Sequence, residues 1–231
     1  MGPGASQRRC SVRRGPGKSW QGERVRFTSA TPERLVDSIA RWIDDRSPER
    51  GVVGFDGPEE IGTAALADNV AARLIAVGRP AVRVSTRWWW RPASLRLEFG
   101  RQEVDTLLRG WVDSAALGRE IIAPLAAGAS HIVARLRDPT TDRSLREQTE
   151  AVPANALVLL DGPFLAALEF TVDALVHLKV SNAALARRLP AERQWWIPVF
   201  ERYRREYRPE DRADVVVSYD HPSAPAMAGI G

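Results

Sequence analysis

Two glycines, Gly57 and Gly62, frame the segment whose residue types come closest to phosphate chemistry. The short apolar run Val52–Phe55 precedes this segment, and a stretch rich in alanine and leucine follows it. A strand, a glycine loop and a helix in this order form a cradle in which backbone N–H groups surround phosphate oxygens. The predicted nucleotide-binding residues are those of the loop: Gly57, Pro58, Glu59, Glu60, Ile61, Gly62, Thr63 and Ala64.

The side chains of this loop depart from what phosphate chemistry requires. The motif G-x-x-x-x-G-K-[ST] uses its lysine as a cation at the phosphates and its hydroxyl to hold Mg²⁺, but this chain has Thr63 and Ala64 there. Glu59 and Glu60 instead bring two carboxylates, and like charges about 4 Å apart repel by roughly 4 kcal/mol at an effective dielectric constant of about 20. Glutamates that point away would leave the backbone cradle open to a phosphate, and the sequence permits both orientations.

Hydrophobic patterning predicts the elements that position the loop. Thr31 is a favourable helix N-cap and Pro32 fits the first helical position. A strand at 52–55, a helix at 63–77 and a strand at 81–85 form a βαβ unit, which implies a parallel sheet and a right-handed crossover. Further strands are expected at 131–136, 156–162, 173–180 and 213–217, edge strands within 138–150, and helices at 115–125, 182–189 and 191–207.

The composition fits one domain with tails. The chain has 231 residues, of which 44% are hydrophobic, and residues 1–27 hold seven Lys or Arg residues against one Glu. We therefore expect a disordered basic tail at 1–30, a domain at 31–222 and a C-terminal tail at 223–231. The body is mildly acidic, which argues against a nucleic-acid partner.

Cysteine and histidine usage and hydropathy narrow the protein class further. Cys10 is the single cysteine and the three histidines are scattered, so we expect no disulfide framework and no metal site formed by these residues. No apolar run approaches the length of a membrane-spanning helix, and the N-terminal segment lacks the features of a secretory signal. A cytoplasmic protein without a membrane partner is expected.

Several segments, in this order along the chain, resemble the uridine kinase family of P-loop kinases. They are Gly54–Pro58 with Gly62, Val84-Ser85 with the following aromatic residues and Arg91-Pro92, Leu159–Leu165, Leu185–Arg188, and Arg212–Val217. The resemblance covers about residues 31–222 and implies an α/β, three-layer P-loop NTPase fold of the nucleoside kinase type with a central parallel sheet. It also implies ATP as the phosphate donor, Mg²⁺ if the site is active, and a nucleoside 5′-hydroxyl as the acceptor.

The departures from this family fall on the positions that carry its chemistry. The family has acidic residues after its second strand, as a base and a magnesium partner, where this chain has Arg87 and Trp88. Arginine cannot act as a base at neutral pH. Asp161 matches the family's acid at the end of the third core strand, either as a water-mediated Mg²⁺ partner or as a structural acid. The lid is shortened and keeps the arginines Arg187, Arg188 and Arg193.

Three further features admit more than one interpretation. Lys179 ends a predicted strand at the ligand-binding edge of a parallel sheet, so it either replaces the missing lysine or is merely solvated. Arg87 is either a metal-independent phosphate ligand or unrelated to phosphate. Trp88, Trp89 and Trp90 cannot all face one core, and they plug the nucleoside pocket, contact a protein partner or stack on a base. Asp161 and Lys179 are the only candidates for a catalytic role.

Three functions follow from these residues. The leading hypothesis is a degenerate uridine kinase-like protein without efficient phosphoryl transfer, which acts as a nucleotide-sensing or protein-binding module through its Trp-rich surface. The second is an active ATP-dependent nucleoside or small-molecule kinase with relocated catalytic groups. The third is a nucleic-acid accessory protein that binds through its basic tail.

Overall fold

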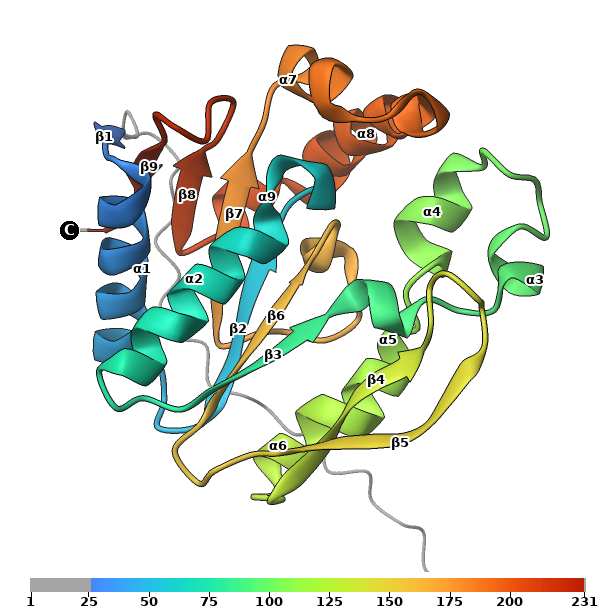
Figure 1. Ribbon diagram of the computed structural model, residues 1–231. Helices are drawn as coiled ribbons and strands as arrows, with labels where there is room; N and C mark the ends of the chain where they lie inside the picture. The colour runs from blue at the N-terminus through green and yellow to red at the C-terminus, as the bar shows by residue number, and fades with distance from the viewer. Residues whose placement is uncertain (1–25, 231) are drawn as a thin grey trace, which may run out of the picture.

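The computed structural model describes residues 26–230, apart from the side chains of residues 146–148. Its centre is a seven-stranded sheet in the order β1-β9-β8-β7-β2-β6-β3 (Figure 1). Five neighbouring strands of this sheet run parallel. They are β3 (Ala81–Ser85), β6 (Leu157–Gly162), β2 (Gly51–Asp56), β7 (Ala174–Lys179) and β8 (Val215–Ser218). The predicted α/β class with a central parallel sheet is thus confirmed, and each of these strands lies at or within two residues of its predicted position.

Helices α1 (Pro32–Arg46) and α2 (Thr63–Ala76) cover one face of the sheet (Figure 1). The Thr31 side chain accepts a hydrogen bond from the Arg34 amide at 3.3 Å, which caps α1 as predicted. Both helices bury an apolar face against inward-pointing residues of the parallel strands, and the strands carry runs of valine and leucine because both faces of the sheet are covered. In this layer the first turn of α2 follows the end of β2 after the six residues 57–62.

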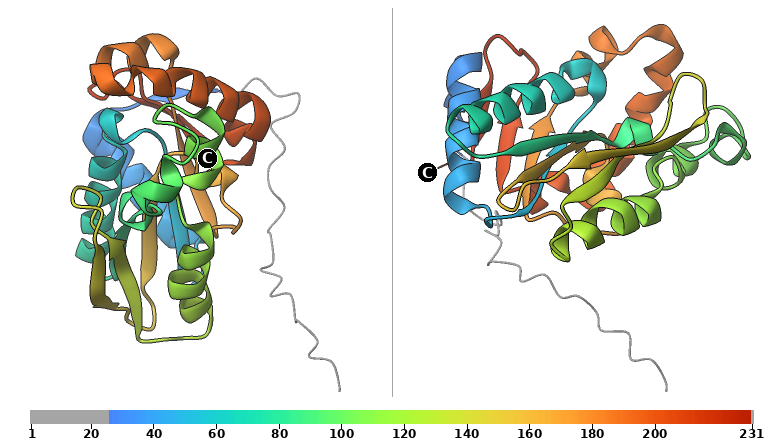
Figure 2. Two further views of the ribbon diagram at one scale, coloured as in Figure 1. Left: turned by 90° about the vertical axis from the view of Figure 1, so that its right-hand side faces the viewer. Right: turned by 60° about the horizontal axis from the view of Figure 1, so that its bottom comes forward.

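The other face of the sheet is covered by a helical segment and a hairpin, which the right-hand view of Figure 2 brings forward. The segment consists of α5 (Ser114–Leu117), a π-helical turn at Gly118–Ile122 and α6 (Ala123–Ala126). The hairpin pairs β4 (His131–Arg137) with β5 (Ser144–Ala151) as a separate antiparallel sheet. Helix, sheet and this second cover give the predicted three layers.

The remaining helices lie at the carboxyl ends of the parallel strands or beside them (Figure 1). They are α3 (Ala93–Arg96), α4 (Val104–Gly110), α7 (Asn182–Arg188), α8 (Ile197–Tyr207) and α9 (Pro209–Arg212). The single helix predicted at 191–207 is wrong for its first part, because residues 191–196 form a 3₁₀ turn. Pro198 has no N–H with which to continue an α-helical ladder backward, so the α-helix begins at Ile197.

Two short strands correct the predicted domain boundaries. β9 (Ala226–Ala228) pairs antiparallel with β8, and β1 (Thr28–Ser29) pairs antiparallel with β9. The tail predicted at 1–30 therefore ends too late, and the tail predicted at 223–231 begins too early. β9 covers the otherwise open edge of β8, and β1 in turn covers the edge of β9. The prediction for residues 1–25 lies outside the described part of the chain. Within residues 26–230, no helix is both long and apolar enough to cross a membrane.

Candidate functional site

The glycine loop, residues 57–64, closes on itself between β2 and α2. Gly62 adopts φ 95°, a left-handed conformation that glycine tolerates, and α2 begins at the next residue. The Thr63 hydroxyl donates a hydrogen bond to the Pro58 carbonyl at 2.6 Å, across the base of the loop. A Cβ atom at Gly57 would lie 2.8 Å from that hydroxyl, so the closed loop requires glycine there. Thr63 thus holds the loop together from a fully buried position.

The middle of the loop is a 3₁₀ turn over Glu59–Ile61, with hydrogen bonds within the turn itself. The Gly62 amide donates to the Glu59 carbonyl at 3.0 Å, and the buried Ile61 side chain packs into the core beneath α2. A phosphate cradle depends on loop amides that point at a shared ligand. Here the amides of Ile61 and Gly62 are engaged within the turn, which removes two of the backbone donors that such a cradle would use.

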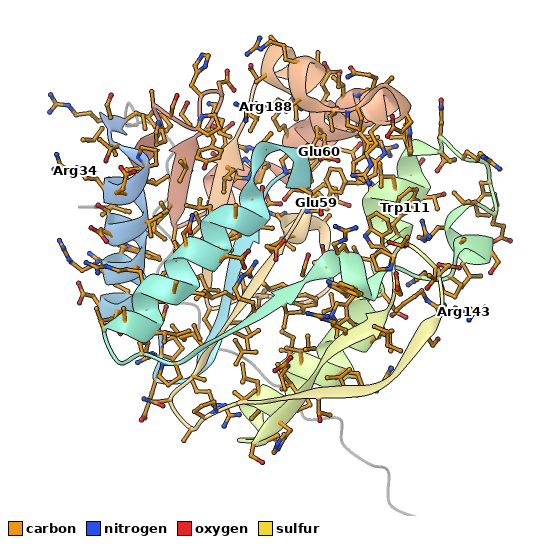
Figure 3. All side chains as sticks on the ribbon, in the orientation of Figure 1. Arg34, Glu59, Glu60, Trp111, Arg143 and Arg188 are labelled. Atoms are coloured by element: carbon orange, nitrogen blue, oxygen red, sulfur yellow. The ribbon has the colours of Figure 1, made fainter. Side chains whose placement is uncertain are left out.

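The two loop carboxylates do not point into solvent but to arginines from two other elements. Arg87, in the turn after β3, pairs with Glu59, and Arg193, in the turn before α8, pairs with Glu60. Arg193 also approaches the second Glu59 oxygen at 4.0 Å. Figure 3 shows Glu59 and Glu60 between the first turn of α2 and the α7–α8 segment. We call these four residues the Glu–Arg cluster.

The Glu–Arg cluster balances its own charge. Its two cations and two anions lie in partly buried positions, and the Glu60 side chain is 13% exposed. An ion pair that is partly withdrawn from water is screened less than one on the open surface. The guanidinium groups that could receive phosphate oxygens are therefore occupied by carboxylates of the same chain.

Asp161, at the end of β6, is held by two residues of β3. The Arg83 guanidinium lies 2.7 Å from one carboxylate oxygen, and the Ser85 hydroxyl donates to the other at 3.1 Å. Burial raises the pKa of Asp161, while the charge and hydrogen bond of Arg83 oppose the rise. Arg83 also pairs with Asp68 on α2 at 2.7 Å. This geometry ties α2, β3 and β6 together and favours the structural interpretation of Asp161.

Sequence reasoning missed a buried polar cluster directly below the loop. The Asp56 carboxylate accepts hydrogen bonds from the Leu165 amide at 3.0 Å, His177 Nδ1 at 2.7 Å and the Tyr203 hydroxyl at 2.7 Å. The Tyr203 oxygen in turn accepts from the Ala166 amide at 3.0 Å. We call Asp56, His177 and Tyr203 the Asp–His–Tyr cluster. It joins the end of β2 to β7, to α8 and to the turn after β6.

Burial and charge determine how the Asp–His–Tyr cluster behaves. Burial and the neighbouring Asp56 carboxylate raise the pKa of Tyr203 well above its ordinary value, so this phenol stays protonated and donates. The chain order alone does not reveal the cluster, because His177 and Tyr203 lie 121 and 147 residues from Asp56. Asp56 at the end of an apolar strand was the only available signal.

The three consecutive tryptophans lie in three different environments. Trp89 is fully buried in the core beneath the second layer. Trp88 lies under the Arg135 guanidinium at 4.6 Å, and Trp90 packs edge-on against Trp111 at 5.1 Å. Trp111 also contacts Trp195 and Trp196, and its side chain lies beside the loop region in Figure 3. Of the three consecutive tryptophans, Trp90 is the one that lines the cavity beside the loop, whereas Trp88 and Trp89 pack with the second layer.

Three of the predicted site residues lie apart from the loop. Lys179 forms an ion pair with Glu210 on α9 at 2.8 Å. Arg188 donates to the Asp220 carbonyl at 3.0 Å, and Arg187 is exposed on the outer side of α7. Of the three lid arginines, Arg193 is the one that reaches the Glu–Arg cluster. The interpretation of Lys179 as a substitute for the loop lysine gains no support from its position.

The cavity that lies beside the loop is too small to enclose Mg²⁺-ATP. The cavity between the loop, the end of β3 and the end of β6 has a volume of about 10 Å³, room for roughly one water molecule. Its walls include Glu59, Arg87, Trp90, Asp161 and Trp196. The second residue of α2 is Ala64, which has no hydroxyl for a metal. As these residues lie, they do not fit a nucleotide or its metal unless the Glu–Arg cluster separates.

No protein-family model matches the sequence. No curated protein matches it by sequence either. The structure is similar to a possible uridine kinase from Bacillus stearothermophilus, at 20% identity and a TM-score of 0.66, over 79% of this chain and 97% of that chain. It is also similar to a candidate fructose transport system kinase from Silicibacter sp. TM1040, at 20% identity and a TM-score of 0.54, over 79% and 92% of the two chains. The YGR205w protein matches at 12% identity and a TM-score of 0.59, over 87% and 100%.

These similarities confirm the predicted fold. The chain has a uridine kinase-like P-loop kinase fold, with the glycine loop between β2 and α2 at the place where such folds bind phosphate. At these identities the likeness concerns architecture, and the chemistry rests on the side chains of this chain.

Proposed function

We propose that this protein uses a P-loop kinase fold without efficient phosphoryl transfer and acts as a nucleotide-sensing or protein-binding module. The observation that carries the proposal is the Glu–Arg cluster. Carboxylates of the loop occupy the arginines of the β3 turn and of the lid, so the chain supplies from within the negative charge that a phosphate would bring.

The missing catalytic groups support the same proposal. Phosphoryl transfer depends on positioning and on charge stabilisation by a loop lysine, a metal and a group that orients the nucleophile. Thr63 uses its hydroxyl to close the loop, and Arg83 and Ser85 hold Asp161. Arg87 stands where a base is required and cannot accept a proton at neutral pH. No remaining residue of the loop supplies these functions.

A sensing role would use the Glu–Arg cluster as its switch. A polyphosphate that binds at the start of α2 must compete with Glu59 and Glu60 for Arg87 and Arg193. Successful competition would separate the loop from the turn before α8, and the released carboxylates would turn to solvent. Such binding would need no Mg²⁺, because the two guanidinium groups supply the positive charge.

Calorimetric titration of the full chain with ATP, with and without Mg²⁺, tests the proposal. A Glu59→Gln/Glu60→Gln variant should bind ATP at least about tenfold more tightly than the unmodified chain, because it removes two competing anions. Asp44→Asn/Asp45→Asn is the matched control, since it removes two exposed acids from α1.

Each outcome of this titration has a distinct meaning. Mg²⁺-independent binding supports a sensor, and no heat with either protein supports a protein-binding module. Tight Mg²⁺-dependent binding with ATP turnover that fails on Asp161→Asn would overturn the proposal in favour of an active kinase.

A further inference from the structure

A second region of the molecule, the α3–α4 surface, has the properties of an interaction site. We define it by Arg91, Leu95, Glu98, Phe99, Thr106 and Gly110, which line an open cavity of about 620 Å³ between α3, α4 and the loop that joins them. Figure 1 shows these two helices at the margin of the molecule, outside the central sheet. The cavity shares no lining residue with the small cavity at the glycine loop.

The α3–α4 surface exposes large apolar side chains beside its cavity. Phe99 is 74% exposed and Leu95 is 51% exposed, and Phe99 is the most exposed large hydrophobic residue among the described residues. Leu95 and Phe99 lie four positions apart, at α3 and just after it. An aromatic side chain held in water next to a hollow surface is a feature that marks contact sites between proteins.

The charges of the α3–α4 surface fall into two groups. Glu103 caps α4 by accepting from the Thr106 amide at 2.6 Å, Asp105 lies 2.8 Å from Arg202, and Arg109 lies 2.9 Å from Glu206. Among the side chains that the structure describes, by contrast, those of Arg91 and Glu98 form no ion pair and no hydrogen bond, although both line the cavity. One cation and one anion on the same surface thus remain available to a partner.

We propose that the α3–α4 surface binds a second copy of this chain across a two-fold axis. Such an interface requires one patch to complement itself, and this patch has both halves of each contact. Phe99 of one copy fits the cavity of its partner, and Arg91 of one copy pairs with Glu98 of the other, in both directions. We expect the dimer to form in a concentration-dependent manner with a dissociation constant on the order of micromolar. The proposal is independent of whether the glycine loop binds nucleotide.

Sedimentation velocity of the full chain over a concentration series up to about 100 µM, above the expected range of dissociation constants, tests this proposal. The unmodified chain should shift from monomer to dimer, and Phe99→Glu should weaken association at least about tenfold by placing a charge in an apolar contact. Ile75→Glu is the control, because Ile75 on α2 is 56% exposed and lies outside the α3–α4 surface. A monomer at all concentrations, or a dimer that Phe99→Glu leaves unchanged, overturns the proposal.

Charge reversal distinguishes a second copy from a different partner. Arg91→Glu and Glu98→Arg should each weaken the dimer at least about tenfold, since each creates two like-charge contacts across the axis. The double variant restores both pairs with reversed polarity and should recover most of the association. Failure of the double variant to recover, with its fold verified by circular dichroism, contradicts the proposed pairing.

Discussion

The glycine loop and the α3–α4 surface differ in whether their charged side chains are paired within the chain. At the loop, Glu59 and Glu60 are paired with arginines from distant elements, and the residual cavity has a volume of about 10 Å³. At the α3–α4 surface, Arg91 and Glu98 have no charged or hydrogen-bonded partner among the described side chains, and the cavity has a volume of about 620 Å³. The region that the glycine-loop motif marks is closed, and the open α3–α4 surface lies outside that motif.

A glycine frame of the phosphate-loop type is therefore a better predictor of the fold than of the ligand that the fold binds. The order of strand, glycine loop and helix sets the backbone path, and that path survives the loss of the lysine and the metal-binding hydroxyl. Side chains determine whether the path is filled by a ligand or by the chain itself. The following experiments test whether the loop region is a closed structural unit and the α3–α4 surface is not.

The largest expected effect concerns Trp89, which is fully buried beneath the second layer and ends the turn that carries Arg87. Trp89→Ala should lower the free energy of unfolding by about 3–5 kcal/mol, because it leaves a large cavity in a fully buried site. Phe99→Ala, on the α3–α4 surface, should change it by less than about 0.5 kcal/mol at concentrations where the chain is monomeric. Urea denaturation measures both values. Similar losses of stability for the two variants would contradict the expected difference between the two regions.

The Asp–His–Tyr cluster should give the next largest effect. Asp56→Asn places an amide N–H₂ opposite two donors, His177 Nδ1 and the Tyr203 hydroxyl, and should lower the free energy of unfolding by about 2–3 kcal/mol. Tyr203→Phe removes one donor only and should cost about 1 kcal/mol. Denaturant midpoints and slopes measure the two losses. If Asp56→Asn leaves the free energy of unfolding unchanged, the cluster does not anchor the loop.

The Glu–Arg cluster should contribute a smaller amount of stability. Glu60→Gln removes one charge of a partly buried pair and should lower the free energy of unfolding by about 1 kcal/mol. Glu98→Gln on the α3–α4 surface removes a charge that has no partner and should have almost no effect on the monomer. Thermal denaturation of both variants at low and high salt compares them, and a salt-insensitive loss at Glu60 would argue against an electrostatic origin.

The smallest expected effect is a pH dependence at Asp161. Burial raises the pKa of this carboxyl above its ordinary 3.8, with Arg83 in opposition, so the folded chain holds the proton more tightly than the unfolded chain. The unmodified chain should therefore lose stability relative to Asp161→Asn as the pH rises from about 3.8 through the raised value, and the difference should then stay constant. Denaturation of both proteins between about pH 4 and pH 7 measures it. A difference that changes in the opposite direction would mean that the Arg83 pair dominates.

Local patterns predicted much of the fold because local physics specifies it. Thr31 and Pro32 predicted the start of α1, and the strands β2, β3 and β6 followed from apolar runs that end at glycine or polar residues. β9 was missed because Ala226–Ala228 has no strand-like pattern of its own. Its conformation depends on the open edge of β8, which belongs to the tertiary structure.

The candidate site was predictable in its backbone and not in its contacts. The loop lies between a strand and a helix as predicted, but Glu60 and Arg193 lie 133 residues apart, so their pairing could not be predicted from spacing. The same holds for Arg83, which reaches Asp161 on a neighbouring strand 78 residues away. Whether the loop carboxylates face phosphate or arginine depends on the positions of three separate elements, which only the folded chain brings together.

The pairing of β1 with β9 makes the chain suitable for circular permutation. Thr28 and Met227 are direct neighbours across this edge of the sheet, so a few added residues could join the two ends of the described domain. New termini at the exposed Gly100, in the loop between α3 and α4, would interrupt the α3–α4 surface and leave the glycine loop intact. A circular permutant of this kind would disrupt the α3–α4 surface without changing the residues of the glycine loop. It would therefore show whether self-association and the response to nucleotide depend on each other.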